Sequence, residues 1–128
     1  MNKKILLTAT IFGMLAIILG AFGAHALKKT LSVDQLSSFE IGVKYLMYHS
    51  FFLYFVGTTN TILEPSKKSI FYLVFFGTIT FSGSIFLLST MPITNINFKS
   101  IGFITPIGGI ILITAWFLVF LKILKQKL

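Results

Sequence analysis

The residues of this sequence with the widest chemical repertoire are its two histidines, His25 and His49. Near neutral pH an imidazole can act as a base, relay a proton or bind a metal ion. Tyr45 precedes His49 by one helical turn, so a helix would place both side chains on one face. Three hydroxyl side chains in apolar surroundings could meet them. We call the resulting set the candidate polar cluster: His25, Tyr45, His49, Ser82, Ser84 and Thr105.

Three kinds of chemistry can be weighed for this cluster. A metal site needs three or four ligands, and two histidines without nearby carboxylates fall short. Serine hydrolysis by Ser82 or Ser84 with His49 would lack an embedded acid. A proton relay through His49 and Tyr45 is compatible with their chemistry. The favoured interpretation is structural, with the hydrogen bonds of His49 fixing helix contacts, so we expect no catalytic residues, no metal and no cofactor.

Composition indicates a membrane protein. Of the 128 residues, 55% are hydrophobic and only 11% are charged, whereas typical chains carry about 25% charged residues. Eleven lysines, no arginine and three acids make the chain strongly basic. The lysines form short clusters between apolar runs, which favours a membrane over nucleic acid as partner. The lack of cysteine excludes disulfides, thiolate catalysis and cysteine-ligated zinc.

Four apolar segments, each near the roughly 20 residues that a spanning helix needs, cover residues 5–27, 43–63, 70–91 and 101–121. A spanning segment must satisfy its own backbone hydrogen bonds, so helices are expected rather than isolated strands. The sequence therefore predicts an all-α fold, an integral membrane four-helix bundle in a single domain over residues 1–128.

The start of the second helix carries its own signal. Ser32 and Gln35 fit a capping box, which predicts an amphipathic helix over 33–42 that leads into the second span. Glu64 and Pro65 are expected to end that helix, because the residue before a proline is disfavoured in helical geometry.

Lysine counts predict the orientation. Seven lysines lie at the N-terminus, the middle connection and the C-terminal tail, against four at the other two connections. Because cytoplasmic segments carry the excess of positive residues, both termini are expected in the cytoplasm. The seven are Lys3, Lys4, Lys67, Lys68, Lys122, Lys125 and Lys127, and the four are Lys28, Lys29, Lys44 and Lys99.

A cleaved signal peptide is the competing interpretation of the first segment. Two lysines, an apolar run and the small-residue pattern at 24–26 resemble a secretory signal with its cleavage site. The apolar run is longer than usual for a signal, however, and small residues recur along it at helix-packing spacing. Cleavage would leave three helices and move the N-terminus outside.

Small residues at helical spacing predict where helices approach one another closely. Packing within one bundle is the favoured interpretation, and a homo-oligomer interface is the alternative. Trp116 and Tyr72 suit an aromatic belt at the membrane surface. The predicted packing residues are Gly13, Ala16, Gly20, Ala24, Gly77, Gly83, Gly108 and Gly109.

Four motifs resemble those of a known family. They read GAFGAHAL at 20–27, YLMYH at 45–49, FSGSIFLL at 81–88 and TPIGG at 105–109, with Ala115 and Trp116 downstream. In this order they are similar to the domain of unknown function 423 family, the YgdD-like bacterial inner-membrane proteins related to eukaryotic transmembrane protein 256. One departure is Ala26, where many relatives have glycine.

The resemblance implies a four-helix protein of the bacterial inner membrane with an uncleaved first helix, and it implies no reaction. Combined with the predicted orientation, it places all four motifs toward the outer halves of their helices. Such convergence would suit either a shared polar pocket or a tightly packed end of the bundle.

Three functional hypotheses follow. The leading one is a structural or accessory protein that lies in membrane lipid and packs with itself or with another membrane protein. The alternative is an oligomeric transporter, or a lipid or small-molecule binding protein, that uses the candidate polar cluster. A membrane enzyme is the third and has the least support from this inventory of groups.

Overall fold

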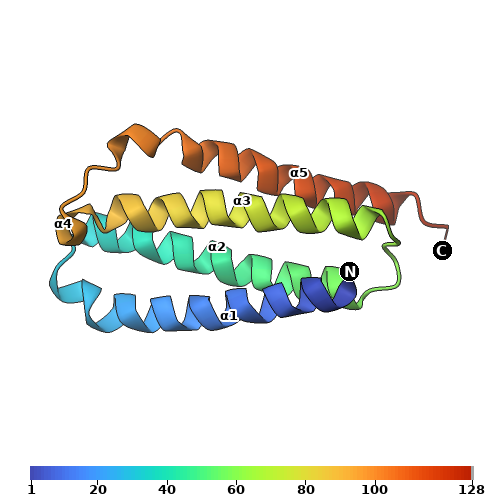
Figure 1. Ribbon diagram of the computed structural model, residues 1–128, viewed down its shortest axis with the longest axis horizontal. Coiled ribbons are helices and arrows are strands. Elements are labelled where there is room, and N and C mark those ends of the chain that lie inside the picture. Colours follow the sequence, from blue (N-terminus) through green and yellow to red (C-terminus); the bar gives the residue numbers. More distant parts are fainter. Residues whose placement is uncertain (128) are drawn as a thin grey trace.

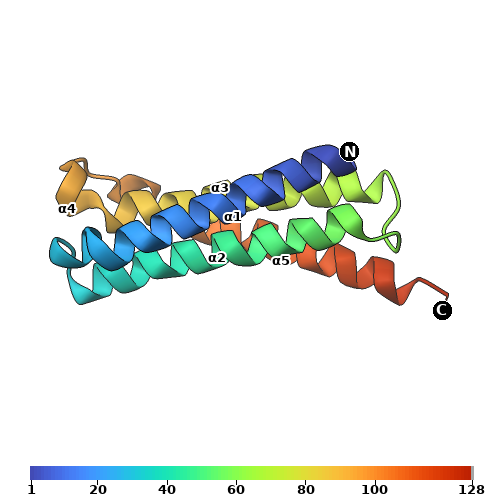
Figure 2. The ribbon, with the colours of Figure 1, turned by 90° about the horizontal axis from the view of Figure 1, so that it is seen from below.

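The computed structural model describes residues 1–127, which fold into helices without any strand. Four long helices run side by side in alternating directions (Figure 1): α1 (Asn2–His25), α2 (Val33–Thr58), α3 (Ser66–Ser89) and α5 (Ile104–Leu124). Three short elements lie in the connections, namely η1 (Leu27–Lys29), α4 (Met91–Thr94) and η2 (Lys99–Ile101). Both termini lie at the end of the molecule that also holds the α2–α3 connection, as Figures 1 and 2 show.

Three helical stretches are long and apolar enough to cross a membrane. They are Asn2–Lys29, Ser66–Ser89 and Lys99–Leu124, and each contains one of the helices α1, α3 and α5. Helix α2 is as long as its neighbours, but its first turns carry Asp34, Glu40 and Lys44. Many large apolar side chains on the outside of the long helices are exposed in the isolated chain, as expected for helices that have lipid as their solvent.

Local sequence determines where α2 begins. The Ser32 hydroxyl accepts a hydrogen bond from the Gln35 amide at 3.2 Å, and the Gln35 side chain accepts one from the Ser32 amide at 3.0 Å. This is the predicted capping box, and α2 starts at Val33 as expected. Helix α2 continues without interruption into its apolar part.

The end of α2 differs from the prediction. The helix ends at Thr58 rather than at Glu64 and Pro65, and Thr59 has extended backbone angles. The Thr59 hydroxyl accepts a hydrogen bond from the Thr61 amide at 3.2 Å. Threonine and asparagine side chains offer the backbone such local alternatives to a helix. The polar residues 58–61 therefore end α2 before Ile62 and Leu63, which the predicted span had included.

Helices α1 and α2 pack through small residues. The Ser50 hydroxyl of α2 donates a hydrogen bond to the Ala9 carbonyl of α1 at 2.6 Å. A Cβ atom added to Gly13 would lie 3.0 Å from the same hydroxyl, and one added to Gly20 would lie 3.4 Å from α2. Ala16, between them, is buried. These residues let the two backbones approach closely, which is how helices associate in lipid.

Helices α3 and α5 form a second close contact. A Cβ atom on Gly77 would lie 2.8 Å from the Leu112 side chain, and one on Gly108 would lie 2.6 Å from the Phe81 backbone nitrogen. The second distance is shorter than real Cβ contacts allow. No side chain larger than hydrogen fits at Gly108 unless the two backbones separate. Gly109 lies beside this contact, where a Cβ would meet the Phe81 ring at 3.7 Å.

Two of the predicted packing residues lie elsewhere. Ala24 is exposed near the end of α1. A Cβ added to Gly83 would meet no atom within 4 Å. Gly83 lies six residues after Gly77 and therefore faces away from the α5 contact. Ala24 shares a face with Gly20, yet it is exposed near the end of α1, so helical spacing alone does not predict which positions make contact.

Candidate functional site

His49 lies buried in the middle of α2, with both ring nitrogens engaged. Its Nδ1 lies 2.7 Å from the Tyr45 carbonyl oxygen, one turn earlier in the same helix. Its Nε2 accepts a hydrogen bond from the Trp116 indole nitrogen of α5 at 3.3 Å. The carbonyl can only accept and the indole can only donate, so this network assigns a neutral imidazole with its proton on Nδ1.

The predicted partners of His49 are therefore wrong. The Ser82 hydroxyl donates to the Gly42 carbonyl of α2 at 2.8 Å. The Ser84 hydroxyl pairs with the Thr105 hydroxyl of α5 at 2.6 Å. Residues two apart on a helix point in different directions, so these two serines join α3 to two different neighbours instead of meeting around His49.

The other two members of the candidate polar cluster lie outside any shared centre. Tyr45 is partly exposed, and its ring packs against the Phe81 ring at a centroid distance of 4.9 Å. His25 is exposed at the C-terminal end of α1. The six residues thus do not form one cluster: five of them take part in hydrogen bonds or ring contacts at different places, and His25 is exposed.

In this arrangement both ring nitrogens of His49 are already engaged in hydrogen bonds. To act as a base or a metal ligand, His49 would have to release Trp116 or the Tyr45 carbonyl. Within residues 1–127, no group of three histidine, aspartate or glutamate side chains gathers to hold a metal ion. The hydrogen bonds of His49, Ser82 and Ser84 tie α2, α3 and α5 together.

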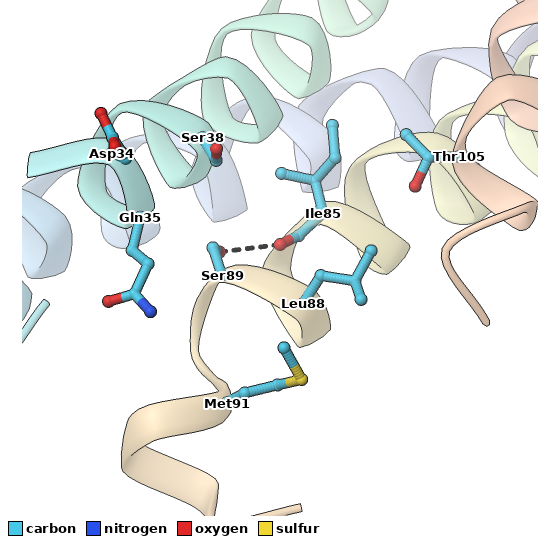
Figure 3. Close-up of a pocket in the computed structure, with 8 residues that line it drawn as sticks. All are labelled: Asp34, Gln35, Ser38, Ile85, Leu88, Ser89, Met91 and Thr105. Atoms are coloured by element: carbon cyan, nitrogen blue, oxygen red, sulfur yellow. Dashed lines mark hydrogen bonds between the residues drawn. The ribbon is translucent and has the colours of Figure 1, made fainter. Parts of the chain in front are cut away.

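A cavity of about 370 Å³ opens between the start of α2 and the end of α3 (Figure 3). Its polar groups do not converge. The Gln35 side chain caps α2, and the Ser89 hydroxyl donates to the Ile85 carbonyl at 2.7 Å. In Figure 3 the Asp34 carboxylate points away from Ile85 and Leu88. The cavity therefore offers a ligand mainly apolar wall.

Several residues that make these contacts are absent from the predicted packing and polar sets. Trp116 was predicted only as an interfacial aromatic, yet its ring also packs on Phe52 at 4.3 Å. A Cβ on Gly42 would lie 2.7 Å from the Phe86 ring, and one on Gly57 would lie 2.9 Å from Leu6. Gly42, Ser50 and Gly57 recur every seven or eight residues along α2. That spacing was a usable signal for a second small-residue face.

Comparison with known proteins adds the family. A family model described as "Protein of unknown function (DUF423)" matches residues 19–109. The chain belongs to this family. The matched range contains the whole candidate polar cluster, whereas Trp116 and the first turns of α1 lie outside it.

Relatives match over almost the whole chain. A UPF0382 membrane protein of Staphylococcus saprophyticus is 34% identical over 123 residues, which cover 96% of this chain and 98% of the relative. The UPF0382 membrane protein YwdK of Bacillus subtilis is 34% identical, with the same coverage of both chains. The UPF0382 inner membrane protein YgdD of Escherichia coli is 28% identical, and the match covers 98% of this chain and 93% of the relative. No solved structure matches the chain. The chain is a membrane protein of the DUF423 family.

Proposed function

We propose that this chain is a structural or accessory protein of the bacterial inner membrane that packs with itself or with a membrane partner. In this proposal all four long helices cross the bilayer, both termini are cytoplasmic, and the chain is not an enzyme. The function is carried out by helix contacts in the membrane.

The observation that carries the proposal is an open groove on the outer side of α3 and α5. It has a volume of about 500 Å³ and lies among Ile79, Gly83, Leu87 and Ile104. A Cβ atom added to Gly83 would meet no atom within 4 Å there. A glycine that meets no helix of its own chain leaves room for a helix of another chain, since small residues permit close approach in lipid.

Two features support the membrane arrangement. Helix α2 lies between α1 and α3 and runs antiparallel to both, so it is expected to cross with them. The seven lysines of the orientation count belong to the terminal segments and the first turn of α3, which share one end of the molecule. The positive-inside rule then favours that end as the cytoplasmic one.

The alternative of an oligomeric transporter, or a lipid or small-molecule binding protein at the candidate polar cluster, has less support. His49 and Ser82 are buried and hydrogen-bonded to other helices. Opening a pathway between them would require breaking the contacts that join α2 to α3 and α5.

Cysteine crosslinking in native membranes tests the proposal, because the chain has no cysteine of its own. Leu87→Cys lies in the groove, and Ile18→Cys provides an exposed control on α1. We expect oxidation to give a disulfide-linked dimer from the first variant and little from the second. Adding Gly83→Leu to Leu87→Cys should fill the groove and reduce the dimer.

Equal crosslinking at both positions would indicate random collision and would argue against the groove. The self-association part of the proposal would also lose its support if Gly83→Leu left the crosslink unchanged. For the orientation, single cysteines replacing Lys68 and Lys99 should react from opposite sides of the membrane with an impermeant thiol reagent.

A further inference from the structure

Lys67, in the first turn of α3, is a buried lysine, with only 4% of its surface exposed. Its ammonium donates a hydrogen bond to the Asn2 side-chain oxygen of α1 at 3.2 Å. An ammonium has three donors, and a buried charge is normally paired with an opposite one. Among residues 1–127 this ammonium forms no salt bridge, and the partner that it contacts is neutral.

The two helices that meet at Lys67 both begin there without a cap. Neither α1 nor α3 has a side-chain hydrogen bond at its N-cap, and neither has an acid in its first turn. Both first turns instead carry lysines, Lys3 and Lys4 in α1 and Lys67 and Lys68 in α3. A helix N-terminus already carries a partial positive charge, which favours anions there and disfavours cations. The positive charges at this end therefore add up.

A cavity of about 180 Å³ opens beside the buried ammonium. Asn2, Thr59 and Asn60 supply hydrogen-bonding side chains to its wall, together with Lys67. The Glu64 carboxylate also lines the cavity, but it forms no ion pair with Lys67 in the part of the chain that the structure describes. The cavity is thus polar, open and next to an unneutralised cation.

Apolar surface adjoins this cavity. Ile62 and Leu63 form part of its wall, and Leu63 is 71% exposed. The neighbouring stretches of α1 and α3 are two of the candidate membrane spans. The cavity therefore lies where two apolar helices begin. The inference below rests on the membrane arrangement proposed above, in which this end lies at the depth of the cytoplasmic lipid headgroups.

We propose that the cavity at Lys67 binds the phosphate group of an anionic phospholipid. The phosphate would accept from the Lys67 ammonium, and Asn2 and Asn60 would supply further hydrogen bonds. A lysine serves phosphate as a point charge, so the lack of arginine is no obstacle. Basic pockets between helices on the cytoplasmic side are typical of sites for anionic headgroups.

Thermal unfolding in lipid nanodiscs tests this site with the full-length chain. Wild-type protein is compared in phosphatidylcholine alone and in phosphatidylcholine containing phosphatidylglycerol. We expect the anionic lipid to raise the unfolding midpoint by about 5 °C, because a ligand that binds only the folded state stabilises it. Lys67→Gln should lose this shift. Lys68→Gln removes the same charge from the adjacent, exposed position and should keep it.

A second variant keeps the test informative if Lys67→Gln folds poorly. Asn2→Asp places a carboxylate beside the Lys67 ammonium and in the first turn of α1. It should raise the midpoint in phosphatidylcholine alone and abolish the further shift with phosphatidylglycerol.

Three results would overturn the proposal. They are an unchanged lipid shift in Lys67→Gln or in Asn2→Asp, an equal loss in Lys68→Gln, and an equal stabilisation of wild-type protein by inorganic phosphate without anionic lipid. The last result would assign the cavity to a free anion. Nanodiscs that hold single chains make the outcome independent of self-association, so failure here leaves the proposed packing with itself or with a membrane partner untouched.

Discussion

The helix N-termini at the two ends of the molecule differ in their capping and in the charges of their first turns. At the end away from the termini, α2 begins with a complete capping box and with Asp34 in its first turn, whereas α5 begins there with neither a side-chain cap nor an acid. At the other end, α1 and α3 both begin uncapped, without acids, and with two lysines each. The first end therefore caps one of its two long helix starts, whereas the second caps neither and adds positive charge around the buried Lys67.

This difference makes the end that holds the termini the better place to look for a binding site. The sequence suggested that the outer motifs around His25 and His49 were the place to look for function. In the structure His49 is fully hydrogen-bonded and His25 is exposed and separate. The buried charge without an ion-pair partner among residues 1–127 lies at the opposite end of the molecule, on Lys67, which entered the sequence analysis only through its charge.

Close helix packing holds the two ends of the molecule in place. The largest loss of stability is therefore expected where that packing is disrupted. Gly108→Ala should destabilise the bundle by about 1–3 kcal/mol, because the new methyl group would overlap the α3 backbone. Gly83→Ala is the matched control and should change stability by less than about 0.5 kcal/mol, because its methyl group enters open space. Unfolding in mixed micelles by added dodecyl sulfate measures both. Equal losses would contradict the close α3–α5 contact.

A smaller effect is expected at the capped end. Ser32→Ala removes the hydroxyl that accepts the Gln35 amide and should cost about 1 kcal/mol. Ser38→Ala, at an exposed position one to two turns later in α2, is the control and should be nearly neutral. The same unfolding assay applies. An unchanged stability in Ser32→Ala would show that the capping box does not stabilise the start of α2 and would contradict the difference between the two ends.

The smallest effect is expected in the interior. Trp116→Phe keeps an aromatic ring against Phe52 but removes the donor to His49, and it should cost about 0.6–1 kcal/mol. A double-mutant cycle with His49→Ala isolates the pair, because the loss should largely vanish when His49 is absent. Strictly additive losses would show that the two residues do not interact.

Local features of the fold and several small residues at the helix contacts were predictable from the sequence, whereas the partners of the buried polar side chains were not. The apolar segments predicted four long helices close to those observed, and the Ser32–Gln35 pair predicted where α2 begins. Both follow from interactions within a few residues. The end of α2 was missed because the polar stretch after Thr58 outweighed the apolar residues that follow it.

The candidate site depended on how the helices are rotated and shifted against one another. Ser82 faces α2 and Ser84 faces α5, and nothing in their spacing to His49 specifies that. Lys67 is likewise buried because the start of α1 packs against the start of α3. Lys67 and Asn2 are 65 positions apart in the sequence and meet only in the folded chain. A lysine cluster in a sequence indicates a cytoplasmic side but not which ammonium lies inside.

The most direct test of the contrast between the two ends is to identify the phospholipid that stays on the protein after mild detergent extraction, by native mass spectrometry. Wild-type protein and Lys68→Gln should both retain an anionic phospholipid, and Lys67→Gln should retain it at a small fraction of that level. Retention at the same level by all three proteins, or by none of them, would contradict the assignment of an external anion to the uncapped, lysine-rich end.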